Sequence, residues 1–304
     1  ADRLNALRNL QKRKEEVSAL IAEMEKMTPE IQAAIDRAGT VTEVDDIYRP
    51  FRPHRKTRAS VAREKGLEAL AVLLMEQRDS YVPSIPEQAL AFVSEEKGVA
   101  SAEEAIAGAK DIIAEDVSDQ AEYRKRLRKL TFDNGTLVVT KAKDEDSVYA
   151  QYYDYSEAVR KIPGHRILAI NRGEKEGVLT VTVLLDRELG LMTLRRAVVR
   201  PGSRAMEFIK AACEDAYDRL IYPSLEREAR SDLTAAACEG AIANFGLNLK
   251  PLLMQPPVKG HVTMGLDPGY AHGCKVAVID GTGRVLDTAV VYPTFGPRQR
   301  QEAI

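Results

Sequence analysis

A short stretch with two prolines gathers most of the side chains that could bind an anion. Residues 49–65 hold seven lysines and arginines against one acid, Glu64. Cations this close repel each other unless an anion or the solvent screens them. Pro50 and Pro53 exclude a regular helix, so the guanidinium groups should follow an extended path. The residues predicted to contact phosphate are Arg49, Arg52, His54, Arg55, Lys56, Arg58 and Arg63.

Arginine suits this chemistry because its planar fork can donate to two phosphate oxygens at once. A second interpretation stays open, however. Glu43, Asp45 and Asp46 lie directly upstream and could pair with these arginines, which would make the stretch a salt-bridged strut between helices. Two further basic clusters are interpreted as solvated helix ends: residues 124–129, placed near a helix C-terminus where cations are favourable, and Arg195, Arg196 and Arg200.

One carboxylate lies in a pattern that resembles a nuclease site. Asp267 ends the first of three expected antiparallel strands, as in the opening of a ribonuclease-H-like fold, where such an acid helps to hold Mg²⁺ together with two or more others. A single Asp cannot hold that ion, and Asp280 is predicted to be a turn residue. We therefore assign no catalytic residue, no metal site and no cofactor, and keep Asp267 as a vestigial candidate.

Periodicity predicts a mainly helical chain with small β elements inserted, an α+β fold. A capping box is expected at Ser101 and Glu104, ahead of a helix. The expected helices cover residues 2–26, 29–38, a stretch from about 60 through 77, the region after Ser101, 204–222 and 224–246. The expected strands are 136–141, a hairpin of 166–171 with 178–185, and then 261–267, 275–280 and 284–292.

Pro251, Pro256 and Pro257 mark a linker between two domains. The predicted domains are residues 1–257, with a β insertion over about 136–185, and residues 258–304.

Composition excludes several classes of protein. The net charge of −2 and pI near 6.2 exclude a polycation, and the absence of Trp argues against an aromatic stacking surface. Cys213, Cys238 and Cys274 are too widely spaced for a zinc site, so buried free thiols in a reducing cytosol are expected. No apolar run is long enough for a membrane span, and a cytoplasmic location is predicted.

Three long motifs resemble the Tex family of bacterial transcription accessory proteins. They are IYRPFRPHRKTRASVAREKGLEALA (47–71), YYDYSEAVRKIPGHRILAINRGEKEGVLTV (152–181) and GLDPGYAHGCKVAVIDGTGRVLDT (265–288), the last similar to the start of that family's YqgF, ribonuclease-H-like domain. The resemblance implies a fragment: part of a helical N-terminal region with a helix-turn-helix, then a YqgF domain that stops early. The S1-type, OB-fold RNA-binding domain of the family would lie beyond it.

The resemblance also implies a role. It points to a nucleic-acid-binding transcription accessory scaffold that acts through backbone contacts, with RNA favoured over DNA. RNA polymerase and other transcription proteins are further candidate partners. Two alternatives stay open: a Mg²⁺-dependent ribonuclease-H-like nuclease or junction resolvase in the full-length protein, and a protein-docking module on the transcription machinery. The chain by itself is expected not to be an enzyme.

Overall fold

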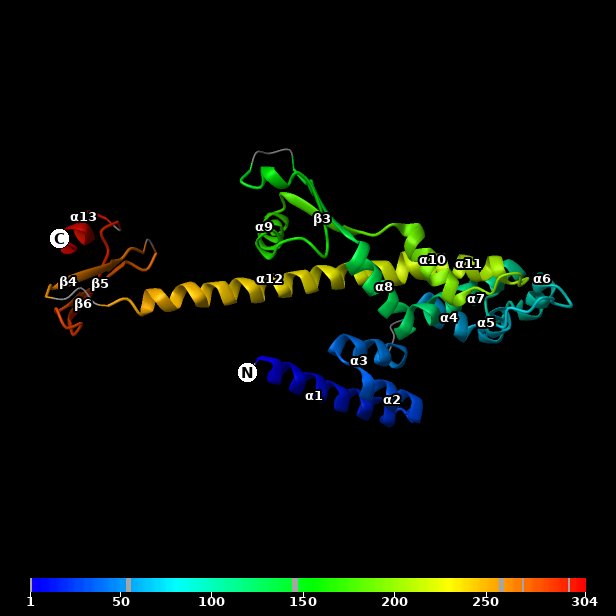
Figure 1. The fold of residues 1–304 in the computed structure, drawn as a ribbon. Helices are drawn as coiled ribbons and strands as arrows, with labels where there is room; N and C mark the ends of the chain where they lie inside the picture. The colour runs from blue at the N-terminus through cyan, green and yellow to red at the C-terminus, as the bar shows by residue number, and fades with distance from the viewer. Residues whose placement is uncertain (1, 53–55, 144–146, 257–259, 270, 295) are drawn as a thin grey trace. The chain divides into compact units, whose positions relative to one another are not determined.

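The computed structural model describes residues 2–52, 56–143, 147–256, 260–269, 271–294 and 296–304. Internal contacts divide the chain into two compact units, Ala1–Gly240 and Ala241–Ile304 (Figure 1). Within the described part, the chain is mainly helical with two three-stranded antiparallel sheets, which confirms the predicted fold class. No helix in these ranges is both long enough and apolar enough to cross a bilayer.

The first three helices form a small core of their own. They are α1 (Asp2–Glu23), α2 (Pro29–Arg37) and α3 (Val41–Tyr48). Val17 and Ile21 of α1 pack with Ile35 and Val44. The Thr28 hydroxyl caps α2 by accepting a hydrogen bond from the backbone N–H of Ile31, as the Thr-Pro pair predicts. A 3₁₀ turn, Arg49–Phe51, follows α3.

The largest core surrounds α7 (Ala102–Ser118), which packs against α4 (Arg58–Glu64), α5 (Glu68–Met75), α6 (Ile85–Ala89) and α11 (Met206–Asp215). The predicted continuous helix from about residue 60 to 77 is wrong. It breaks into α4 and α5 because Gly66 adopts a left-handed φ of 80°. The remaining elements of this region are a 3₁₀ turn Leu90–Phe92, α8 (Ala121–Asn134) and α10 (Arg187–Val198).

The predicted capping box at the start of α7 forms only in part. The Ser101 hydroxyl accepts from the Glu104 N–H, as expected. The Glu104 carboxylate accepts from the N–H of Ala100 at 3.0 Å, one residue before the expected partner.

The β insertion contains a helix where a strand was expected. Its strands are β1 (Thr136–Lys141), β2 (Asp154–Ala158) and β3 (Leu179–Leu184), in the order β2-β1-β3, with a 3₁₀ turn Ala150–Tyr152 before β2. Residues 166–171 lie in α9 (Gly164–Lys175), so the predicted hairpin of 166–171 with 178–185 is wrong. Ile167 and Ile170 bury one helical face on the sheet, a spacing that a short apolar run cannot distinguish from strand alternation.

The outer edge of β3 is covered by side chains of α12 (Tyr222–Leu253). The Tyr222 hydroxyl donates to the Val183 carbonyl at 2.6 Å, and Glu226 accepts from the Val183 N–H at 3.1 Å. One turn further along, Arg230 donates to the Val181 carbonyl at 3.0 Å. Three residues spaced four apart therefore satisfy backbone groups that would otherwise leave an open sheet edge.

The helices predicted at 204–222 and 224–246 join without a break. α11 runs into a π-helical turn, Ala216–Ile221, and then into α12. Pro251 lies inside the last turns of α12, so the linker begins later than predicted. The predicted domain boundary between residues 257 and 258 lies outside the described residues.

The second unit contains the three predicted strands, β4 (Thr263–Asp267), β5 (Cys274–Ile279) and β6 (Val285–Val291), followed by α13 (Pro297–Glu302). The Asp280 carboxylate accepts from the N–H groups of Thr282 and Arg284, which confirms it as a turn residue.

Of the cysteines, Cys213 is buried, and burial raises the pKa of its thiol to about 12. Cys238 is exposed, so the expectation of a buried thiol is wrong there.

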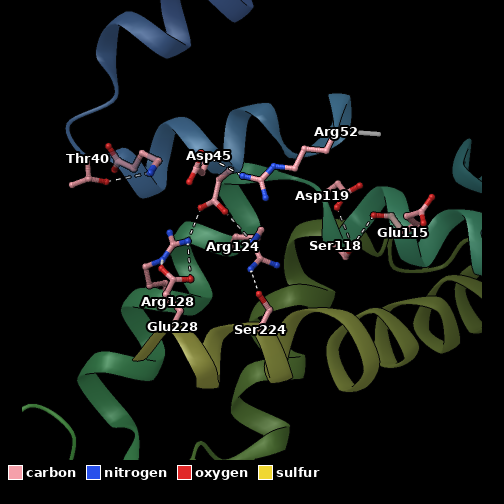
Figure 2. Close-up of polar contacts among 12 residues, drawn as sticks. Thr40, Asp45, Arg52, Glu115, Ser118, Asp119, Arg124, Arg128, Ser224 and Glu228 are labelled. Carbon is pink, nitrogen blue, oxygen red and sulfur yellow. Dashed lines mark hydrogen bonds and ion pairs between the residues drawn. The ribbon is translucent and has the colours of Figure 1, made fainter. Parts of the chain in front are cut away.

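A buried carboxylate joins α3 to α8. Asp46, only 4% exposed, accepts from Arg124 Nε at 3.0 Å and from Arg128 Nη2 at 2.6 Å. Arg124 also donates to the Ser224 hydroxyl, and Arg128 to Glu228, both on α12 (Figure 2). The interpretation of residues 124–129 as a solvated helix end is therefore wrong for these two arginines. The sequence could not show this, because their partners lie far away along the chain. Burial, followed by repulsion from Arg49, lowers the pKa of Arg124.

Removing the Asp46 carboxylate should be costly. Asp46→Ala leaves Arg124, which is 1% exposed, without an anionic partner in a buried position. We expect a loss of about 3–5 kcal/mol in the free energy of unfolding, measured by urea denaturation. Asp45→Ala is the matched control, because Asp45 is one residue away on the same helix but pairs with Arg13 near solvent. That variant should lose about 1 kcal/mol or less; equal losses would contradict the account.

A second prediction concerns the close approach of α10 to the π-helical turn. A Cβ placed on Gly190 would stand 2.3 Å from the hydroxyl oxygen of Tyr217, whose buried ring stacks on Tyr222. Gly190→Ala should therefore destabilise the chain by about 1–3 kcal/mol through overpacking. Gly240→Ala, where nothing lies within 4 Å of the new Cβ, should instead stabilise α12 by about 0.5–1 kcal/mol. Denaturation midpoints that rise in both variants would exclude this packing.

Candidate nucleic-acid interface

The predicted phosphate-contacting residues lie between α3 and the end of α4. Arg49 is in the 3₁₀ turn, Arg52 follows it, and Lys56 precedes α4. Arg58 and Arg63 lie on α4, whose first turn is fixed by reciprocal hydrogen bonds between Thr57 and Ser60. His54 and Arg55, together with Pro53, lie outside the described residues.

Arg52 is engaged by the protein itself. Its Nη2 lies 3.3 Å from the Asp45 carboxylate (Figure 2). Its guanidinium carbon lies 5.6 Å from the centre of the Tyr48 ring. Asp45 also accepts from Arg13 at 2.7 Å. This pairing is the one that the strut interpretation predicts, and it fixes the beginning of the basic stretch to α3 and α1.

Arg63 is engaged at the other end of the stretch. Its two terminal nitrogens each lie 2.6 Å from a carboxylate on α7, those of Glu115 and Asp116. Burial opposes the charge on Arg63, but the two carboxylates outweigh it and raise the pKa of this guanidinium. Sequence reasoning missed both partners, since they lie on α7, far downstream of the acids at 43–46.

Two of the three upstream acids form ion pairs with cations of α8 and not with the basic stretch. Glu43 pairs with Lys125 at 2.7 Å, and Asp46 binds Arg124 and Arg128. Together with its hydrogen bond from the Gly39 N–H, the contact with Lys125 lowers the pKa of Glu43. Of the three acids proposed as strut partners, Asp45 is therefore the one that pairs with a described cation of the stretch.

Lys56 and Arg58 differ from their neighbours. Both side chains are exposed, and neither forms an ion pair with the described part of the chain. Arg58 still acts at a distance, since its charge is among those that lower the pKa of Asp215. Arg49 is half-buried, and its Nε is buried with no hydrogen-bond partner among the described residues. The structure thus separates the paired Arg52 and Arg63 from the exposed Lys56 and Arg58 between them.

Asp267 lies where the sequence placed it, at the end of β4. It is paired in register with Lys275 of β5, whose ammonium lies 3.9 Å from the carboxylate. In the described ranges, no group of three or more His, Cys, Asp or Glu residues is arranged to hold a metal ion. By itself Asp267 supplies one ligand, which is too few for a Mg²⁺ site.

Comparisons with known proteins agree with the motifs. Residues 83–245 match the model described as "Tex central region-like", and residues 261–304 match the "Tex protein YqgF-like domain". The helix-turn-helix expected from the resemblance stays a prediction.

Individual relatives match along nearly the whole chain. YdcI of Bacillus subtilis, called uncharacterized, is 42% identical over all of the chain and 43% of its own length. The transcriptional accessory protein Tex of Neisseria gonorrhoeae is 35% identical over 96% of the chain and 39% of the relative. The human "S1 RNA-binding domain-containing protein 1" is 32% identical over 98% of the chain and 31% of its own length.

The chain therefore spans less than half the length of these relatives. Along the chain, the match to the central region precedes the match to the YqgF-like domain. Because the central-region model by itself matches more than half of the residues, the chain belongs to the Tex family.

Proposed function

We propose that this chain is part of a nucleic-acid-binding accessory protein of transcription, and that it contacts the sugar–phosphate backbone. The names of two relatives support this role: one is a transcriptional accessory protein and the other an S1 RNA-binding domain-containing protein. RNA is the favoured partner, and RNA polymerase is a candidate partner of the whole protein.

The observation that carries the proposal is the exposure of Lys56 and Arg58 between two anchored ends. Arg52 is tied to Asp45, and Arg63 is tied to Glu115 and Asp116. Arg58 lies on α4, the helix that Arg63 ties to α7, so this exposed cation is carried by an anchored helix. Such cations neutralise phosphate charges without reading the bases, because backbone contacts carry no sequence information directly.

This arrangement makes the two interpretations of residues 49–63 complementary. The salt-bridged arginines form the strut, and Lys56 and Arg58 provide the contact surface on it. Anchoring α4 to α7 reduces the backbone entropy lost on binding, whereas the exposed side chains become ordered only when they bind. The nuclease alternative would need further carboxylates beside Asp267 to hold a metal ion. The protein-docking alternative is favoured by no specific contact among the described residues.

The salt dependence of binding tests this proposal. The affinity of the chain for a labelled single-stranded RNA would be measured by fluorescence anisotropy from about 50 to about 200 mM salt. Lys56→Ala with Arg58→Ala should reduce the slope of log affinity against log salt by about 1.4, because each lost phosphate contact on a single strand contributes about 0.7.

The matched control is Arg196→Ala with Arg204→Ala. It removes the same charge from two exposed arginines that form no ion pair in the described ranges. Its slope should equal that of the wild type. An unchanged slope in the Lys56 and Arg58 double variant would leave these residues with no part in binding.

A further inference from the structure

A second set of exposed cations lies on the β insertion, away from residues 49–63. Arg160 and Lys161 are in the turn before α9, and Arg172 and Lys175 are on α9 itself. All four side chains are exposed, and none forms an ion pair with a residue that the structure describes. We call these four residues the α9 cationic row.

The acids near this row are held by other groups. Across residues 159–178 there are five lysines and arginines against two acids, Glu174 and Glu176. Glu174 pairs with Arg230 of α12, and Glu176 accepts a hydrogen bond from the Tyr149 hydroxyl at 2.8 Å. The fifth cation, Arg166, is itself occupied by Glu157 at 3.0 Å. Across residues 159–178, the four cations of the row therefore stand against one carboxylate, that of Glu176, that pairs with no cation the structure describes.

The support beneath the row is rigid. Ile167 and Ile170 bury the opposite face of α9 on the sheet, and Gly164 approaches α12 so closely that a Cβ would stand 3.1 Å from the Cα of Ala237. Arg230 binds both Glu174 and Asn171, tying the middle and end of α9 to α12. α9 is thus packed on the sheet and hydrogen-bonded to α12, and Arg172 and Lys175 lie about one turn apart on it.

We propose that the α9 cationic row is a second contact surface for the phosphate backbone of a nucleic acid. The row offers charge without an exposed aromatic side chain, so it suits phosphates and not base stacking. The inference goes beyond the proposed function by assigning a separate site on a different element. It rests on the proposed function only in its choice of a nucleic acid as the polyanion.

Four alanine substitutions, made as two pairs, test the row. Arg172→Ala with Lys175→Ala, and Arg160→Ala with Lys161→Ala, should each reduce the salt slope for single-stranded RNA by about 1.4. Combined, the two losses should add to about 2.8, because each pair neutralises different phosphates. Far-ultraviolet circular dichroism and the denaturation midpoint should match the wild type, since all four side chains are exposed.

The control is again Arg196→Ala with Arg204→Ala, with an unchanged slope expected. Polyglutamate serves as a competitor, and it should displace the RNA poorly, since a phosphodiester chain is the expected occupant. Equal displacement by polyglutamate, or equal slope changes in the control and α9 variants, would overturn the inference in favour of general charge attraction.

The design separates failure of the inference from failure of the proposed function. If the Lys56 and Arg58 variant flattens the slope and both α9 pairs leave it unchanged, the row is not a binding surface and the proposed function stands. If the α9 pairs flatten it and the Lys56 and Arg58 variant does not, the binding surface lies on the insertion. If the wild-type chain shows no salt-dependent binding, both are overturned.

Discussion

The helical body depends on compensation of buried charge at Asp46. Its carboxylate accepts from Arg124 and Arg128, and these two arginines also donate to Ser224 and Glu228 of α12. A helix as cationic as α8 could not otherwise lie between α3 and α12, because an unpaired guanidinium in a buried position is strongly disfavoured. One acid thus connects the N-terminal helices to the main core. Because Arg124 and Arg128 bind this acid, they are not available to bind a ligand.

The same principle shapes the candidate interface. Acids on α3 and α7 hold Arg52 and Arg63, and Lys56 and Arg58 between them are exposed. On the β insertion, Arg230 and Tyr149 interact with the acids of α9, while Arg172 and Lys175 are exposed and form no ion pair with a described residue. In both places the internal ion pairs do not compete with binding. They fix the elements that carry the exposed charge, so the surface is organised before any ligand arrives.

Much of the helical pattern and the β4–β6 meander could be predicted because local signals specify them: the Thr28-Pro29 cap, the apolar spacing of α7, and the Gly-rich turn after Asp280. The errors arose where a distant partner decides. Residues 166–171 form a helix because Ile167 and Ile170 pack against a sheet made of other segments. Arg124 is buried because Asp46 lies 78 positions earlier. Neither fact can be deduced from the short stretch of sequence around the residue. For the site, the sequence identified the basic stretch but could not tell Arg52 and Arg63, which are paired, from Lys56 and Arg58, which are exposed.

The central claim is that exposed cations on anchored elements contact the nucleic-acid backbone. Photo-crosslinking with 4-thiouridine-substituted RNA, followed by mass spectrometry of the crosslinked peptides, tests it most directly. The account predicts crosslinks in the peptide that contains Lys56 and Arg58 and in the peptides of α9, at salt concentrations where binding is specific. Crosslinks confined to Ala241–Ile304, or spread evenly over cationic and acidic surfaces, would contradict it.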